Sequence, residues 1–229
     1  GDMCYDSSYA MFKQEFFRPR ELDLLANVPF FLAVGNHETW AANTKAFTQA
    51  PASASGTQDY YSFDYGDVHF LCLNNEVPYL AGTPQYEFAA KDLAGTKKPW
   101  KIVFAHSPAY CAGGHGEDPA MVALTAKVFE PNKVDLALTG HSHFYQHNLV
   151  NGIHHLVIGT AGAPFKDLGN ASYTLKSAKE YNYAVIDMTP ATLHLVVYNQ
   201  LGAVLDTLVL SKTAAPARSE ERRVGKECR

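Results

Sequence analysis

The chain has 229 residues, of which 47% are hydrophobic and 12% aromatic, and its formal net charge at pH 7 is −4. This composition is typical of a globular protein, and a chain of this length can bury one sizeable core, so we expect one domain rather than a disordered chain. The acidic balance argues against a nucleic-acid partner, and no run approaches the roughly 18 apolar residues that a membrane-spanning helix needs, so we expect no membrane partner either.

The first part of the chain is expected to alternate helices with strands. Residues 11–26 have apolar side chains at a helical spacing that Pro19 interrupts, which predicts two short helices. The continuous apolar run VPFFLAV, residues 28–34, predicts a strand that is buried on both faces. Residues 59–75 predict two strands joined by a turn, and residues 84–93 predict a helix with one apolar side.

The second part of the chain becomes increasingly rich in strands. Residues 100–105 and 133–139 predict strands, and residues 121–129 between them predict a helix. Short β-rich runs separated by Gly, Pro and Asn turns follow to the end of the domain. The pattern predicts an α/β sandwich with mostly parallel central strands and an antiparallel finish. The small-residue segment 49–58 is expected to be a mobile loop.

The composition changes abruptly at Arg218. The last twelve residues, RSEERRVGKECR, have no apolar period that could pack on a core and resemble an in-frame translation of a sequencing adapter. We therefore expect a folded domain over residues 1–211, a linker over 212–217 and a non-native tail over 218–229, with a native basic tail as the alternative. Without the tail the cysteines are odd in number, which argues against a disulfide framework: Cys4, Cys72 and Cys111.

Polar side chains of the kinds that bind metal ions directly follow three of the predicted strands: Asn36, His37, His106, His141 and His143. Open α/β folds place their sites at the carboxyl ends of the strands, so these side chains are expected to lie close together. Side chains one residue apart on an extended chain point to the same side, as expected for the two histidines of the run GHSH. The opening GDMCY adds Asp2 and Tyr5 from what is expected to be another strand end.

Each of these residues also has a purely structural interpretation. A single histidine such as His106 is more often a structural residue, Asn36 is typical of a turn, Asp2 could cap a helix and Tyr5 could belong to the core. The joint pattern, in order and each time after an apolar strand, favours a metal site. We interpret the remaining histidines as structural or surface residues: His69, His147, His154, His155 and His194.

Four short motifs make the pattern specific. They are Gly-Asp-x-x-Tyr at residues 1–5, Gly-Asn-His-Glu at 35–38, Val-x-x-His at 103–106 and Gly-His-x-His at 140–143. In this order they resemble the calcineurin-like metallophosphoesterases, and Tyr5 makes the chain most similar to the purple acid phosphatases. The resemblance covers residues 1 to about 165 by motif. It implies an α/β fold of the metallophosphoesterase type, a β-sandwich flanked by helices, with the family's first strand missing from this sequence.

The resemblance also implies a site for two metal ions. It assigns Asp2 to both ions, Tyr5 and His143 to the first ion, and Asn36, His106 and His141 to the second. Phenolate and carboxylate oxygens suit trivalent iron, whereas imidazole and amide oxygen suit zinc, manganese or iron(II). We therefore expect Fe(III) together with Zn, Mn or Fe(II). Two such cations can hold a hydroxide between them and neutralise charge on a phosphoryl group.

Two further histidines are candidates for catalytic contacts with the substrate. His37 follows Asn36 and is not a ligand in the family, so the resemblance implies that it contacts the phosphate and either stabilises charge or protonates the leaving alkoxide. His115 lies nine residues after His106 in a segment similar to the His-Ser-Pro segment of plant purple acid phosphatases, where histidines face the substrate. The alternative for His115 is a loop histidine among glycines.

The implied activity is hydrolysis of phosphate monoesters by a metal-bound hydroxide, with small-molecule phosphate esters as substrates. A phosphodiesterase or nucleotidase on the same scaffold is the alternative among enzymes, and a non-catalytic binding module is the alternative of another class. An exported protein, periplasmic or extracellular, is implied by the family alone. The family's first motif, Asp-x-Gly or Asp-x-His, is expected upstream of Gly1. Because its aspartate would be a further ligand of the first ion, we expect the chain as printed to be a weak catalyst and marginally stable.

Overall fold

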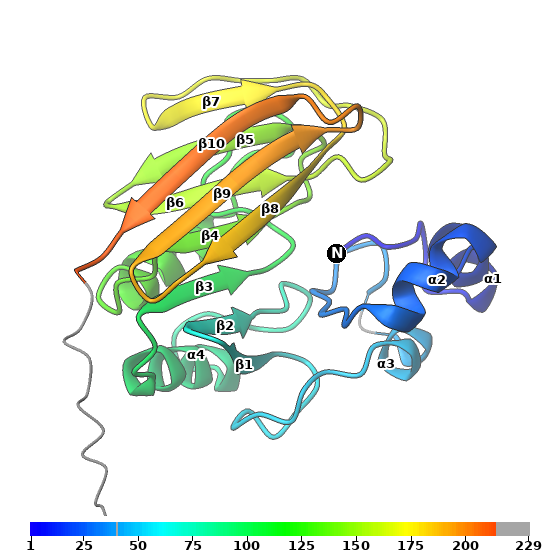
Figure 1. Cartoon of the computed structure of the whole chain (residues 1–229). Helices are drawn as coiled ribbons and strands as arrows, with labels where there is room; N and C mark the ends of the chain where they lie inside the picture. Colours follow the sequence, from blue (N-terminus) through cyan, green and yellow to red (C-terminus); the bar gives the residue numbers. More distant parts are fainter. Residues whose placement is uncertain (40, 214–229) are drawn as a thin grey trace, which may run out of the picture.

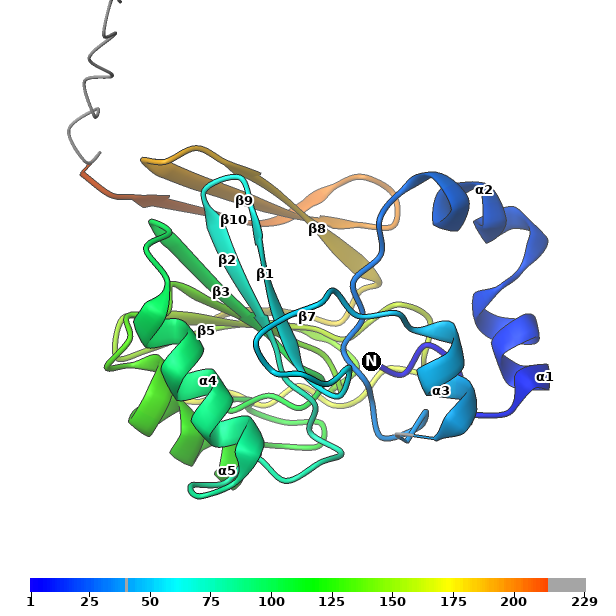
Figure 2. The same ribbon diagram turned by 90° about the horizontal axis from the view of Figure 1, so that it is seen from below.

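The computed structural model describes residues 1–39 and 41–213. The predicted tail over residues 218–229, and residues 214–217 of the predicted linker, lie outside the described residues. Two β-sheets pack face to face, and helices cover the other face of the larger sheet (Figures 1 and 2). This is the α/β sandwich flanked by helices that the sequence predicts.

Seven strands of the described residues form the larger sheet, in the order β1-β2-β3-β4-β6-β5-β7. Their bounds are β1 Tyr61–Tyr65, β2 Val68–Cys72, β3 Trp100–Phe104, β4 Leu136–Thr139, β5 Tyr145–Val150, β6 Ile153–Ile158 and β7 Thr174–Ala178. The central strands β2, β3, β4 and β6 are parallel, and the outer pairs are antiparallel. The predicted mixture of parallel centre and antiparallel finish is confirmed.

The smaller sheet is antiparallel and closes the sandwich. It consists of β8 (Asn182–Met188), β9 (Thr192–Asn199) and β10 (Val204–Ser211). Alternate residues of β9 are buried, because one face of this strand packs on the larger sheet while the other faces outward. The core between the sheets includes Trp100, Leu136 and Tyr145 from the larger sheet and Leu193, Leu195 and Val197 from β9.

Helices α4 (Pro84–Gly95) and α5 (Pro119–Leu124), the latter continued by the π-helix η2 (Thr125–Phe129), cover the opposite face of the larger sheet (Figure 2). Both α-helices begin with proline after a capping residue. The hydroxyl of Thr83 accepts a hydrogen bond from the N–H of Tyr86, and the carboxylate of Asp118 accepts from two N–H groups of the first turn of α5. The helices predicted at 84–93 and 121–129 are therefore present.

The N-terminal segment lies beside the sheets rather than on either face (Figure 1). It contains α1 (Tyr9–Met11), the π-helix η1 (Phe12–Phe16), α2 (Pro19–Asn27) and α3 (Ala42–Phe47). The predicted interruption at Pro19 is confirmed, because this residue begins α2. Phe12 is fully buried and its ring packs against the ring of Phe47, which joins the first helices to α3. No helix of the described part of the chain has both the length and the apolar character needed to cross a membrane.

The prediction of a strand over residues 28–34 that is buried on both faces is wrong. The segment has no strand pairing, and three of its large side chains are exposed: Val28 (47%), Phe30 (51%) and Phe31 (44%). An apolar run becomes a strand only where a neighbouring backbone offers a hydrogen-bonding edge. Here the carbonyl of Leu32 instead accepts hydrogen bonds from the side chains of Tyr61 and Cys72.

The parallel strands determine where polar side chains gather. β3 and β4 run in the same direction in register, so the residues that follow them leave the sheet at one edge. That edge faces the N-terminal segment (Figure 1). His106, two residues after β3, and His141, two residues after β4, are therefore brought toward Asp2.

Candidate metal centre

The N-terminal segment is held against the turn at residues 35–38 by a buried carboxylate. Glu38 is fully buried, and its two oxygens accept hydrogen bonds from the N–H groups of Asp2 (2.8 Å), Cys4 (2.9 Å) and Gly35 (3.0 Å). Hydrogen bonds to an ionised carboxylate are about twice as strong as those between neutral groups. Glu38 therefore holds the segment that carries Asp2 against the turn that carries Asn36.

Gly35 allows this close approach. A Cβ atom at this position would lie 2.1 Å from Oδ1 of Asp2, which no side chain could tolerate. The same Oδ1 accepts a hydrogen bond of 3.0 Å from the N–H of His37. The glycine of the Gly-Asn-His-Glu motif thus leaves room for the Asp2 carboxylate to lie directly on the turn.

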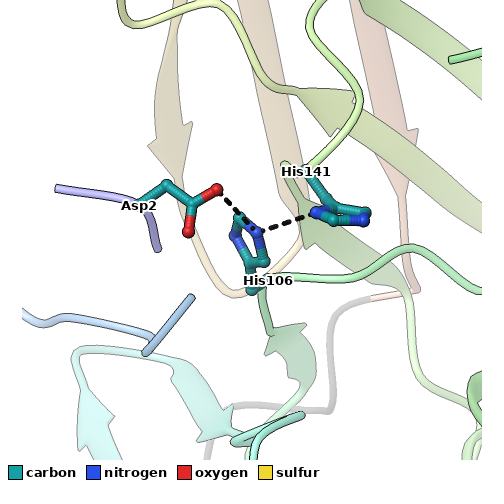
Figure 3. Close-up of side chains that lie close together, drawn as sticks. All are labelled: Asp2, His106 and His141. Carbon is teal, nitrogen blue, oxygen red and sulfur yellow. Dashed lines mark hydrogen bonds and ion pairs between the residues drawn. The ribbon is translucent and has the colours of Figure 1, made fainter. Parts of the chain in front are cut away.

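Three side chains converge on one nitrogen of His106. Its Nε2 lies 3.0 Å from Oδ1 of Asn36, 3.1 Å from Nδ1 of His141 and 3.1 Å from Oδ2 of Asp2. The ligand atoms of Asp2, His106 and His141 all lie within 4.8 Å of one another (Figure 3). Four of the six predicted metal ligands are therefore close together, although they come from four separate segments of the chain.

Hydrogen bonding alone does not account for this arrangement. An imidazole nitrogen carries at most one proton, so Nε2 of His106 can donate to only one of its acceptors. The other ring nitrogen, Nδ1, is buried and has no hydrogen-bond partner in the described part of the chain. Ligands about 2.1 Å from a shared cation lie roughly 3.0 to 3.4 Å from one another, which is the spacing around Nε2. The donor set thus fits a metal ion.

The protonation states suit metal binding. Burial opposes ionisation of Asp2, but the hydrogen bond and charge of His106 outweigh it and lower the pKa of Asp2 to about 2. Burial, together with the charges of His106 and His115, lowers the pKa of His141 to about 4. A metal ligand must be a carboxylate or a neutral imidazole, so near neutral pH both side chains are in the form that binds cations.

The backbone is strained at two of these positions. Asp2 has a φ of 57° and His141 a φ of 62°, although neither is glycine. Residues other than glycine adopt this left-handed region at a cost of order 1 kcal/mol or more, and residues in this conformation concentrate at functional sites. The backbone strain is therefore located at two of the residues whose side chains converge.

The two further predicted ligands lie at the margin of the cluster. Tyr5 is 72% exposed, and its ring centroid is 5.0 Å from that of His37. His143 is hydrogen bonded through Nδ1 to the carbonyl of Pro164 at 2.7 Å, which leaves Nε2 available. Neither side chain is among those that converge on Nε2 of His106, so their role as ligands of a first ion stays a prediction.

Both predicted catalytic histidines lie beside the predicted ligands. Nδ1 of His37 is 2.9 Å from the carbonyl of Tyr5. The ring of His115 stacks on that of His141 with centroids 4.3 Å apart, and its centroid is 5.9 Å from that of His143. Burial lowers the pKa of His115, and the positive charge of Lys166 lowers it further.

Three residues that matter for the site were not singled out from the sequence. Glu38 was available as the last residue of Gly-Asn-His-Glu, but only the fold shows the N–H groups that it binds. The side-chain oxygen of Asn75, which follows β2, accepts hydrogen bonds from the N–H groups of His106 and Ser107 and so fixes the chain after β3. Lys166 is placed near His115 by a loop that no sequence pattern predicts.

Comparison with known proteins shows the family to which the chain belongs. Residues 1–145 match the model of the calcineurin-like phosphoesterase family. The chain is 25% identical over 260 residues to a protein of Arabidopsis thaliana named probable inactive purple acid phosphatase 1, covering 93% of this chain and 42% of that protein. It is 27% identical over 174 residues to purple acid phosphatase 15 of the same plant, covering 69% of this chain and 32% of that protein.

A solved structure shares the fold over most of the chain. The purple acid phosphatase PPD1 from yellow lupin (Lupinus luteus) seeds superposes with a TM-score of 0.81 at 25% identity, covering 92% of this chain and 45% of that one. The chain thus spans less than half the length of these relatives. With the matched model extending over more than half of its residues, the chain belongs to the calcineurin-like phosphoesterase family and, within it, is similar to the purple acid phosphatases.

Proposed function

We propose that this chain is the catalytic part of a metal-dependent phosphatase that binds two metal ions and hydrolyses phosphate monoesters. The observation that carries the proposal is the convergence of Asp2, Asn36 and His141 on Nε2 of His106, all within 3.1 Å. The second ion would be held by these four residues. The first ion would be held by Asp2, Tyr5 and His143, with Fe(III) suited to the phenolate and Zn, Mn or Fe(II) suited to the imidazoles.

Bound cations would supply Lewis acidity, which neutralises charge on a phosphoryl group and lowers the pKa of water. The chain's own residues supply positioning and a proton. The N–H of His37 donates to Asp2 and fixes the carboxylate, while Nδ1 of His37 lies against the carbonyl of Tyr5. Because a carbonyl can only accept, Nδ1–H of His37 donates to it, and Nε2 is the atom that would give a proton to a leaving alkoxide when the ring is in its doubly protonated, imidazolium form. His115, stacked on His141, is the second group proposed to contact the leaving group.

A specific observation favours a second candidate function. Two relatives that cover 93% of this chain are named probable inactive, so a non-catalytic module that retains the fold is the competing proposal. A phosphodiesterase on the same scaffold is the other competitor, because the metal ligands determine the reaction while the loops determine the substrate. We also propose that the protein is exported and that its substrates are small phosphate esters.

The test is to load the purified chain with Fe(III) and Zn(II) or Mn(II), count bound metal, and compare turnover of 4-nitrophenyl phosphate with that of bis(4-nitrophenyl) phosphate. We expect the monoester to be preferred, and His37→Ala to lower kcat by about 10²- to 10⁴-fold while metal content is retained. A preference for the diester would establish the phosphodiesterase. Two bound metal ions per chain without turnover of either ester would favour the non-catalytic module, whereas a single bound ion would point to the missing ligand of the first ion.

A further inference from the structure

The loop after β6 bends back onto the predicted ligand His143. It spans residues 159–173, between the end of β6 and the start of β7. The carbonyl of Pro164 accepts a hydrogen bond of 2.7 Å from Nδ1 of His143, and the N–H of Lys166 donates to the carbonyl of His143 at 3.3 Å. Two contacts with one residue therefore hold the part of the loop that carries Lys166 beside the candidate metal centre.

The same loop is also bonded to the segment that carries His115. The N–H of Gly114 donates to the carbonyl of Asp167 at 2.9 Å, and Asp167 directly follows Lys166 in the loop. The loop is therefore held between the segments of His115 and His143, and hydrogen bonds at Lys166 and at the next residue fix its backbone.

The positive charge of Lys166 lies near the ring of His115. Burial lowers the pKa of His115 most, and the charge of Lys166 makes the next largest contribution. The ring of His115 in turn stacks on that of His141, with centroids 4.3 Å apart, and its centroid is 5.9 Å from that of His143. A cation is thus placed next to histidines that are predicted to bind metal or to contact the substrate.

The ammonium group of Lys166 is available to an anion. The residue is exposed, and within residues 1–39 and 41–213 its side chain forms neither an ion pair nor a hydrogen bond. The neighbouring carboxylate of Asp167 is paired with Lys179 instead, at 3.1 Å. The carboxylate of Asp2, whose charge also acts on His115, is a predicted ligand of both metal ions. Neither carboxylate pairs with Lys166, so its charge is not neutralised by them.

The two classes of phosphate ester differ in their charge. A phosphate monoester has a second ionisation at about pH 6 and carries about two negative charges at neutral pH, whereas a diester carries about one. Metal ions attract both classes, but a further cation beside the metal centre gains more from the second charge of the monoester. A lysine ammonium suits this interaction, because it is a compact charge on a flexible stem that can reach a phosphoryl oxygen.

We infer that Lys166 is a specificity-determining residue, whose ammonium binds the phosphoryl oxygen that is ionised in a monoester and esterified in a diester. The inference rests on the proposed phosphatase function and deepens it by naming the residue that selects the class of ester. Lys166 forms an ion pair with this oxygen and takes no part in proton transfer. It therefore contributes to binding of the substrate and of the product phosphate rather than to the chemical step.

The first experiment measures the Kd of inorganic phosphate for the metal-loaded chain by calorimetry at pH 8. We expect Lys166→Met, which keeps an unbranched side chain, to weaken phosphate binding by about 3- to 10-fold while metal content is retained, because it removes one exposed ionic hydrogen bond. Lys166→Arg should restore most of the loss, because it restores the charge. The matched control is Lys127→Met on η2, which removes an exposed lysine from the opposite face of the larger sheet and should not change the Kd.

The second experiment compares kcat/KM for 4-nitrophenyl phosphate with that for bis(4-nitrophenyl) phosphate. In Lys166→Met we expect the value for the monoester to fall by the factor measured for phosphate, mainly through KM, and the value for the diester to fall by less than about 2-fold. An unchanged Kd for phosphate, or an equal loss for the two esters, overturns the inference even if the original chain hydrolyses both. If the original chain binds phosphate but hydrolyses neither ester, the proposed function is contradicted, and the Kd of Lys166→Met still decides the role of Lys166.

Discussion

Two clusters of histidine and aspartate occupy different parts of this molecule. The first, called here the metal-side cluster, consists of His106 and His141, which follow the parallel strands β3 and β4, and of Asp2 and Asn36 from the N-terminal segment. The second, called the sandwich cluster, lies between the two sheets and consists of Tyr145 on β5, His147 on β5, His154 on β6 and Asp206 on β10. Their contact distances are similar, at 3.0 to 3.1 Å in the first and 2.7 to 2.8 Å in the second.

The two clusters differ in how their protons can be arranged. In the sandwich cluster one arrangement satisfies every contact: Tyr145 and Nδ1 of His147 donate to Asp206, and Nδ1 of His154 donates to Nε2 of His147. In the metal-side cluster no arrangement does, because three partners share Nε2 of His106. The number of partners per ligand atom, rather than residue type or distance, therefore separates a ligand set from a structural hydrogen-bond network.

Removal of His106 should have the largest effect on the metal-side cluster. We expect His106→Ala to weaken metal binding by more than about 100-fold, because it removes the proposed ligand on which the others converge. Changing a group that only hydrogen bonds to a metal ligand already lowers metal affinity by about 10- to 100-fold. Metal should raise the Tm of the original chain, since a ligand that binds only the folded state stabilises it, and this rise should disappear in the variant. Calorimetric titration with Zn(II) and thermal unfolding with and without metal measure both effects.

The matched control lies in the sandwich cluster. His154→Ala also removes a histidine that is hydrogen bonded to another histidine, and it should leave the metal affinity unchanged. Equal loss of affinity in the two variants would contradict the assignment of only the first cluster as a metal site.

Removing the acceptor of the sandwich cluster should affect stability instead. Asp206→Ala leaves the hydroxyl of Tyr145, which is fully buried, and Nδ1 of His147 without a partner. An unsatisfied buried donor costs about 1 to 3 kcal/mol, so we expect the free energy of unfolding to fall by about 3 kcal/mol. Urea denaturation measures the loss, and metal affinity of the folded variant should match that of the original chain. A loss of metal affinity without a loss of stability would reverse the roles of the two clusters.

The sequence reveals the metal-side cluster better than the sandwich cluster for a physical reason. His106 and His141 follow apolar strands, and parallel strands bring such positions to one edge whatever their exact packing, so these two predicted ligands could be found from local patterns. Asn36 was found from its motif, although the apolar run before it is not a strand. The contact between His147 and Asp206 joins residues 59 positions apart across two sheets, and only the packing of the sheets specifies it. The strand predicted over residues 28–34 failed for the same reason, because pairing depends on a partner that the local pattern does not contain.

His155 should have a smaller effect, and on stability rather than on metal binding. Its ring has an unpaired nitrogen, but it is not one of the predicted metal ligands. It is 3% exposed, its Nε2 has no partner within the described residues, and burial lowers its pKa to about 4, helped by the charge of His154. The unfolded chain takes up this proton near pH 6.5 and the folded chain does not, so stability is lost as pH falls from about 6.5 toward 4. Between pH 8 and pH 5 we expect the free energy of unfolding of His155→Leu to fall by about 2 kcal/mol less than that of the original chain. Urea denaturation at both pH values measures this difference. Identical pH dependence in the two proteins would show that His155 does not resist protonation in the folded state.

His69 should show the smallest effect and the opposite sign. Its Nδ1 is 2.8 Å from Asp64 and its Nε2 is 2.7 Å from Asp92, so each nitrogen has one partner, as in the sandwich cluster. Burial opposes protonation, but the hydrogen bonds that His69 donates to Asp92 and Asp64 outweigh it and raise the pKa of His69. The stabilisation is therefore fully present below about pH 6.5 and is lost as pH rises through the raised value. We expect the original chain to lose about 1 kcal/mol more than His69→Gln between pH 6 and pH 9, the value of one hydrogen bond. If the free energy of unfolding depends on pH in the same way in both proteins, the imidazole of His69 is neutral throughout. A steeper fall for the original chain would mean that histidine and aspartate stabilise the fold by charge here. In the metal-side cluster, the same two residue types would instead stay available for cations.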